Sequence, residues 1–121
     1  MKYFVVLVLI GLLLCVSGQT FNGTFEWSDD GSMEGSCGIV YNTFYNKIAL
    51  ISDKWFSSDL QACKCNLKVD YQGKSITVAI SGKSADGEDK NKVELSYAAF
   101  YALNPSNTLG YNAVFTFVDC Q

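Results

Sequence analysis

The chain has 121 residues with 9 basic and 12 acidic side chains and no histidine, which gives a formal net charge of −3. This length supports one hydrophobic core, and scattered basic residues on an acidic chain argue against a nucleic-acid partner or an anionic membrane surface. The lack of histidine excludes Ser-His-Asp catalysis and leaves a cysteine nucleophile without its usual base.

The first segment has the order of a secretory signal peptide. Lys2 precedes an apolar run over residues 3–16, and Ser17, Gly18 and Gln19 follow it. This order predicts a signal peptide over residues 1–18 and a mature, extracellular domain over residues 19–121. The run is short for a bilayer span, which disfavours the alternative of an uncleaved anchor. Removal of Lys2 leaves 8 basic against 12 acidic residues, a net charge of −4.

The mature sequence has the pattern of an all-β domain. Its apolar residues come in short runs bounded by Gly, Asn, Asp and Ser, without long helical periodicity. Gln72 and Gly73 predict a tight turn between two of the strands. The expected strands are 23–27, 47–51, 65–71, 75–81 and 113–118.

Two further segments follow the fourth of these strands. Residues 81–92 are rich in Gly, Asp and Lys and predict a surface loop. In residues 96–103, Ser96 can cap a helix, the alanines favour it, and Phe100 and Leu103 lie on one face. We expect a short helix there, packed on the sheet and ended before Pro105.

Four cysteines remain after the signal peptide: Cys37, Cys63, Cys65 and Cys120. An even number in a small exported chain predicts two disulfides, for which three pairings exist. Cys63 and Cys65 are too close in sequence to pair easily. A metal site is the alternative, but without histidine the Cys-x-Cys spacing is weak support, and we expect neither a metal nor a cofactor. Asn22-Gly23-Thr24 is an N-glycosylation sequon.

Several motifs, in their order, resemble the expansin double-psi β-barrel. GTFEWSDDGSMEGSCG (residues 23–38) resembles its Thr-Phe-Tyr strand, Gly/Ser loop and Gly-Ala-Cys-Gly turn. KIALISDKWF (47–56), ACKCNLKV (62–69) and VELSYAAFYAL (93–103) resemble later segments of the same domain. The resemblance covers nearly all of the mature chain. It implies a six-stranded barrel with one or two short helices, shared with rare-lipoprotein-A-like domains, barwin-like proteins, cerato-platanins, family 45 endoglucanases and some secreted papain inhibitors.

The resemblance also has implications for disulfides and catalysis. Similarity to cerato-platanins implies the pairs Cys37–Cys63 and Cys65–Cys120. In enzymes of this superfamily an Asp supplies the acid at the end of a strand that is similar to ITVAISG (residues 76–82), where this chain has Ser81. A hydroxyl cannot act as that acid at neutral pH, so we expect a protein that is not an enzyme.

Carboxylates elsewhere are the alternative source of an acid. Glu26 stands where the family usually has Tyr, and Asp86, Glu88 and Asp89 lie in the predicted loop. Loop acids are more often solvated surface groups than tuned catalytic groups. A residual glycan hydrolase or lytic enzyme is therefore the least favoured hypothesis.

A polysaccharide groove is the favoured site. Aromatic rings bind the apolar faces of sugars, while Asp, Asn and hydroxyl groups bind sugar hydroxyls. Trp55 is also an aromatic candidate, with burial in the core as the equal alternative. The predicted groove residues are Thr24, Glu26, Trp27, Tyr41, Tyr45, Ser81 and Asp86.

Two functional classes follow from the resemblance. The first is a monomeric, expansin-like protein that binds or loosens cell-wall polysaccharide (cellulose, chitin or peptidoglycan) without the second, carbohydrate-binding domain of expansins. The second is a module that binds an extracellular protein, as a cysteine-protease inhibitor or an elicitor. Exposed aromatic residues aligned along the groove would favour the first class, and a protruding rigid loop over residues 81–92 would favour the second. A buried carboxylate pair that includes Glu26 would favour the residual hydrolase.

Overall fold

The computed structural model describes residues 17–28, 32–56, 61–84 and 89–121. Most of the predicted signal peptide lies outside these ranges, as do Asp86 and Glu88 of the acidic loop. Within these ranges, no helix has the length and apolar character needed to cross a membrane.

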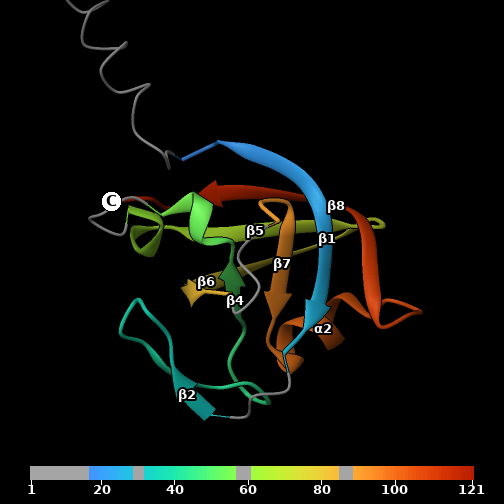
Figure 1. The fold of residues 1–121 in the computed structure, drawn as a ribbon. Coiled ribbons are helices and arrows are strands. Elements are labelled where there is room, and N and C mark those ends of the chain that lie inside the picture. Colours follow the sequence, from blue (N-terminus) through green and yellow to red (C-terminus); the bar gives the residue numbers. More distant parts are fainter. Residues whose placement is uncertain (1–16, 29–31, 57–60, 85–88) are drawn as a thin grey trace, which may run out of the picture.

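Six strands close into a barrel in the spatial order β1-β7-β4-β6-β5-β8 (Figure 1). The pairs β1–β7 and β4–β6 are parallel, and the other neighbouring pairs are antiparallel. Parallel neighbours need crossover connections, and closure leaves no unpaired sheet edge. The structure confirms the expected double-psi β-barrel. Its strands are β1 (Thr20–Trp27), β4 (Ile48–Ile51), β5 (Asn66–Tyr71), β6 (Lys74–Lys83), β7 (Lys92–Leu95) and β8 (Leu109–Val118).

The barrel interior is filled by alternate residues of each strand. In β5, Leu67 and Val69 are fully buried, and in β8 Phe115 and Phe117 are fully buried, while the residues between them are less buried. This period of two places one face of each strand in the core. Phe21 of β1 stacks on Phe115, with ring centroids 4.9 Å apart. The core is therefore rich in aromatic side chains at this end of the barrel.

The predicted turn and helix are both present. Gln72 and Gly73 have φ angles of 48° and 80°, the two positive values of a type I′ hairpin turn. Helix α2 (Tyr97–Leu103) begins after Ser96, whose Oγ accepts a hydrogen bond from the Ala99 amide (3.3 Å). The same Oγ accepts from the Ile48 amide (3.0 Å), so one side chain caps the helix and joins it to β4.

Several elements were not predicted from the sequence. These are the 3₁₀ turns η1 (Asp53–Trp55) and η2 (Gln61–Lys64), the strand β7 and the small sheet of β2 (Ser32–Glu34) and β3 (Val40–Asn42). Strands β1, β6 and β8 are also longer than expected, so the loop between β6 and β7 is shorter than residues 81–92. The missed strands have three or four residues, too few for a periodic pattern to stand out.

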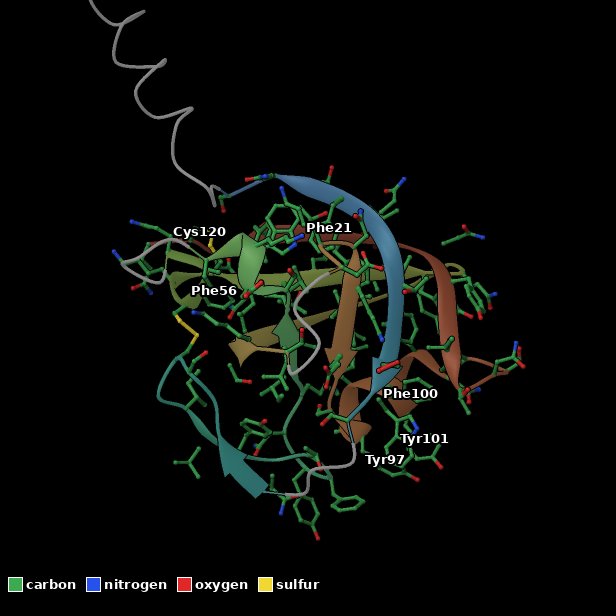
Figure 2. The ribbon with its side chains drawn as sticks, viewed as in Figure 1. Phe21, Phe56, Tyr97, Phe100, Tyr101 and Cys120 are labelled. Atoms are coloured by element: carbon green, nitrogen blue, oxygen red, sulfur yellow. A yellow bond between two sulfur atoms is a disulfide. The ribbon has the colours of Figure 1, made fainter. Side chains whose placement is uncertain are left out.

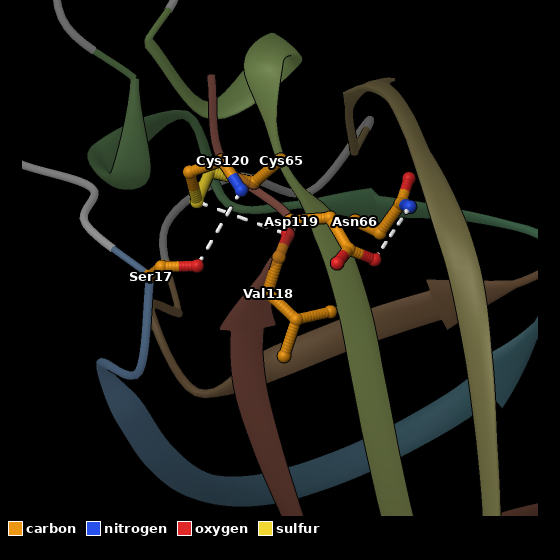
Figure 3. Close-up of a disulfide and its surroundings, with 6 residues drawn as sticks. All are labelled: Ser17, Cys65, Asn66, Val118, Asp119 and Cys120. Atoms are coloured by element: carbon orange, nitrogen blue, oxygen red, sulfur yellow. Dashed lines mark hydrogen bonds between the residues drawn. A yellow bond between two sulfur atoms is a disulfide. The ribbon is translucent and has the colours of Figure 1, made fainter.

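Two disulfides join Cys37 to Cys63 and Cys65 to Cys120, which confirms the pairing implied by the family resemblance. The second bridge links the start of β5 to the end of β8 (Figure 3). Asn66 Nδ2 donates to Asp119 Oδ2 beside it (3.2 Å). Because this bridge spans 55 residues and the other 26, it constrains the larger loop of the unfolded chain.

Candidate binding surface

Four aromatic side chains form a connected group at the end of the barrel where β1 and β7 reach α2. Trp27, Phe44 and Tyr101 are 39%, 57% and 57% exposed, and Tyr97 lies between them. The Tyr97 ring centroid is 5.2 Å from that of Trp27, 5.2 Å from that of Phe44 and 4.2 Å from that of Tyr101. Figure 2 shows Tyr97 and Tyr101 at the opposite end of the molecule from Phe21. We call these four residues the aromatic cluster.

The rings of the aromatic cluster are positioned by separate elements, namely β1, α2 and the turn after β3. Trp27 ends β1 two residues after the buried Phe25, so it shares the inward side of the strand but lies at its end, where its ring reaches α2. Tyr97 and Tyr101 are four residues apart in α2 and thus neighbours on one face of the helix. The opposite face of α2 carries Ala99, Phe100 and Leu103 into the core.

Phe44 is placed by a hydrogen-bonded turn after β3. Asn42 Oδ1 accepts from the Phe44 amide (2.9 Å), and Asn46 Oδ1 accepts from the Asn42 amide (2.8 Å). The Thr43 carbonyl accepts from the Ala98 amide (2.9 Å), which ties the turn to the first turn of α2. Side-chain amides that bond nearby backbone groups fix the shape of such a turn.

The rings of the aromatic cluster do not share a plane. The interplanar angle is 84° between Tyr97 and Tyr101, 66° between Phe44 and Tyr97, and 55° between Trp27 and Tyr97. Tilted pairs place the edge of one ring against the face of another and leave other faces open. A hydrogen bond with Tyr101 raises the pKa of Tyr97 above its usual value, and tyrosine side chains are already neutral at physiological pH. The cluster is therefore an uncharged and uneven apolar surface.

Of the predicted groove aromatics, two are exposed and one is not. Trp27 belongs to the aromatic cluster, and Tyr45 is 83% exposed on the turn next to Phe44. Tyr41 is only 3% exposed and packs with Ile48 and Leu50, which contradicts the expected half-exposure after the Gly-Ser-Cys-Gly turn. The prediction of an exposed Tyr41 was wrong because β3 directs this side chain toward the barrel.

Trp55 is a core residue. It is buried against Phe21 and Phe117, and its Nε1 donates to the Lys90 carbonyl (2.8 Å). Burial of the ring with its N–H satisfied is the ordinary role of a tryptophan in a core. Of the two alternatives for Trp55, a surface aromatic residue or a core residue, the structure shows the second.

Ser81 is fully buried and has no accessible hydroxyl. Its Oγ donates to the Ala49 carbonyl (3.4 Å), and its own carbonyl accepts from the Cys37 amide (2.9 Å). The loop at Gly35 passes so close that a Cβ there would overlap the Ser81 carbonyl. Ser81 therefore cannot contact a polymer in this structure, and its expected place in the groove is corrected.

Glu26 lies outside the barrel, where its carboxylate is 3.4 Å from Lys92 Nζ in a half-exposed ion pair. The buried polar side chains of the described residues are all Ser or Thr, so no buried carboxylate pair that includes Glu26 occurs among them. In the same ranges, no group of three or more Cys, Asp or Glu is arranged to hold a metal ion.

Thr24 lines a hollow of about 310 Å³ between β1 and β8, separate from the aromatic cluster. Asp86 lies outside the described residues. The predicted groove residues therefore do not form one site. The structure instead brings Trp27 together with Phe44, Tyr97 and Tyr101, which sequence reasoning missed. The spacing of Tyr97 and Tyr101, on the face of the helix away from Phe100 and Leu103, was the available signal.

Comparison with solved structures reveals proteins of the same architecture. A Streptomyces papain inhibitor is 24% identical, with a TM-score of 0.76 over 84% of this chain and 96% of the inhibitor. The fold is a double-psi β-barrel. The expansin of Clavibacter michiganensis matches as a mutant in complex with cellohexaose (20% identity, TM-score 0.68) and in its apo form (19%, 0.68). In each case 83% of this chain is covered and the match spans half of the expansin. No family model and no curated protein matches the sequence.

Proposed function

We propose that this is a secreted, non-enzymatic protein that binds cell-wall polysaccharide through the aromatic cluster. The observation that carries the proposal is a connected set of rings on the barrel, in which Trp27, Phe44 and Tyr101 are exposed and the partly exposed Tyr97 joins them. A pyranose ring presents a flat face of C–H groups, and its burial against an aromatic ring gains a modest free energy that adds along a polymer.

The tilt between the rings bears on the kind of polymer. A flat crystalline face needs coplanar rings, whereas rings at 55° to 84° to one another can contact successive sugars of one chain that bends or twists. We therefore expect binding to single glycan chains, whether of cellulose, chitin or peptidoglycan. The fold shared with an expansin bound to cellohexaose supports a polysaccharide as the ligand class.

Export fits the rest of the chain. Residues 1–18 are the proposed signal peptide, and two disulfides suit an oxidising, extracellular compartment. Cleavage before Gln19 would remove the hydrogen bond from the Gly18 amide to the Phe117 carbonyl. The barrel keeps the pairing of Thr20 with Thr116 at the same place.

Titration with soluble oligosaccharides tests the proposal. Cellohexaose, a chitin hexamer and peptidoglycan fragments are added to the disulfide-bonded protein while tryptophan emission is recorded. Since Trp55 is buried, the change in emission reports on Trp27. Tyr101→Ala keeps this reporter and is expected to weaken binding about fivefold, as loss of one stacked ring costs on the order of 1 kcal/mol.

The matched control is Tyr111→Ala, because Tyr111 is a similarly exposed tyrosine that lies in the hollow and not in the aromatic cluster. It is expected to bind as the wild type does. Equal affinity of Tyr101→Ala and the wild type, or no binding of any oligosaccharide, would rule out this function. Sugar release in the same samples would contradict the non-enzymatic assignment.

An extracellular protein partner is the second candidate. The likeness to a papain inhibitor over nearly all of that protein supports it, as does the loop before β3. Cys37 fixes this loop to Cys63, the Lys83 amide donates to Ser36 Oγ (3.0 Å), and Val40 beyond them is 76% exposed. A braced loop followed by an exposed aliphatic side chain, here Val40 at the start of β3, loses little entropy when it enters a protease cleft.

Inhibition of papain distinguishes the two candidates. If the loop is the contact, Val40→Asp abolishes inhibition, whereas Trp27→Ala leaves it unchanged. Oligosaccharide binding has the opposite dependence on these two variants. Absence of inhibition at micromolar concentrations of the wild-type protein would remove papain-like proteases from the partners considered.

A further inference from the structure

The hollow between β1 and β8 includes the chain's N-glycosylation sequon in its lining. It is lined by Asn22, Gly23, Thr24, Tyr111, Asn112 and Val114, so all three sequon residues contribute to it. Its volume of about 310 Å³ is at the lower end of the range of small-ligand pockets, roughly 300–1,000 Å³.

A β-bulge produces the hollow. Gly23 pairs with Ala113 and Phe25 with Gly110, so two residues advance on β1 while three advance on β8. Asn112, the residue that breaks the register, has a φ of 60°. As a result, Tyr111 and Asn112 are both exposed, although successive strand residues normally alternate. The ring of Tyr111 and the amide of Asn112 therefore face solvent side by side.

The sequon is held in a fixed position at the edge of this hollow. Asn91 Nδ2 donates to the Asn22 carbonyl (2.7 Å), and the Thr24 amide donates to the Asn91 carbonyl (3.0 Å). A Cβ at Gly23 would overlap that carbonyl, which explains glycine as the middle residue. The Asn22 side chain is exposed, and within the described part of the chain its amide makes no hydrogen bond.

We infer that Asn22 carries an N-linked glycan when the protein passes through a eukaryotic secretory pathway, and that the first sugar of this glycan packs in the hollow against Tyr111. In the transfer step, Asn22 Nδ2 loses one proton and forms a bond to C1 of N-acetylglucosamine. The bond from C1 to the pyrophosphate of the lipid-linked oligosaccharide donor breaks, and the lipid pyrophosphate leaves.

The lining of the hollow suits this sugar. Tyr111 and Val114 offer apolar surface for the C–H face of the first N-acetylglucosamine, and the Asn112 amide can bond its acetamido group. A sugar held there covers Thr24, so the hollow would not serve as a polysaccharide groove. This inference does not depend on the proposed function, because the hollow and the aromatic cluster share no residue.

The first test is the mass of the full chain secreted from a eukaryotic host. One N-glycan is expected, and peptide N-glycosidase should release it and convert Asn22 to Asp. Asn22→Gln and Thr24→Ala should lack the glycan, whereas Thr24→Ser should keep it. Asn104-Pro105-Ser106 is an internal control, because proline in the middle position prevents transfer. A secreted wild-type chain without glycan would overturn the inference.

The second test concerns the packing of the first sugar. We expect the folded glycoprotein to be trimmed by an endoglycosidase several-fold more slowly than the glycopeptide, and Tyr111→Ala to remove most of this protection. Tyr45→Ala, at an exposed tyrosine outside the hollow, should trim at the wild-type rate. Equal rates for the wild type and Tyr111→Ala would show that the sugar does not pack on this ring.

Discussion

Two groups of aromatic rings in this barrel have similar ring spacings but different surroundings. At one end, Phe21, Trp55 and Phe117 are buried with ring centroids 4.6 to 6.0 Å apart. At the other end, the rings of the aromatic cluster are 4.2 to 5.2 Å apart, but Trp27, Phe44 and Tyr101 are exposed to solvent. Contact between rings therefore does not distinguish core from binding surface. The distinction comes from the open faces, which contribute to binding only where a ligand can cover them.

The largest expected effect is at the buried end. Phe115→Ala should lower the free energy of unfolding by about 3 to 5 kcal/mol, since it leaves a cavity under Phe21. Chemical denaturation measures the change. Phe115→Leu should lose less, about 1.5 kcal/mol or below, and remain folded. The exposed counterpart Tyr101→Ala should change stability by less than about 0.5 kcal/mol. Similar losses for Phe115→Ala and Tyr101→Ala would contradict the comparison.

Removal of the disulfides tests what supports the buried end. Replacement of Cys65 and Cys120 by Ala should cost about 4 kcal/mol on the loop-entropy model. The same change at Cys37 and Cys63 should cost about 0.7 kcal/mol less, because its loop is 26 rather than 55 residues long. Thermal unfolding of both double variants gives the order. A larger loss for the Cys37 and Cys63 variant would mean that native-state contacts of that loop outweigh loop entropy.

At the exposed end the expected effect is on binding. Trp27→Ala should weaken oligosaccharide binding about tenfold or more, because the largest ring of the aromatic cluster contributes on the order of 1 to 2 kcal/mol when a sugar covers it. Calorimetry is the suitable measurement, since this variant lacks the fluorescent reporter. Its unfolding midpoint should stay within a few degrees of the wild type. Unchanged affinity would place the binding surface elsewhere on the barrel.

The smallest effect is expected at the ion pair between Glu26 and Lys92. Glu26→Gln removes a half-exposed contact with Lys92 and should cost less than about 1 kcal/mol of stability. Oligosaccharide binding should match that of the wild type, and neither protein should release sugar, because Glu26 is assigned no catalytic role. A reducing-sugar assay beside the unfolding curve checks both points. Loss of an existing sugar-releasing activity in this variant would instead identify Glu26 as an acid.

The candidate surface was only partly predictable from the sequence. Trp27 is predicted from the sequence because it ends a strand and borders an acidic loop, whereas Phe44, Tyr97 and Tyr101 were missed. Their proximity to Trp27 depends on the helix packing against the end of β1, and no local pattern contains that contact. Tyr41 and Ser81 were predicted to be accessible but are buried, because segments distant in sequence cover them.

The sequence by itself determined the features that depend on local chemistry: the all-β pattern, the Gln72-Gly73 turn, the helix capped by Ser96 and the sequon at Asn22. The motif order, as a family resemblance, also predicted the barrel and its disulfides. Only the tertiary structure decided which aromatic rings are buried, which carboxylate is paired with a lysine, and where the bulge opens a hollow. Burial and pairing depend on residues brought together from different strands, and a linear pattern does not record that closeness.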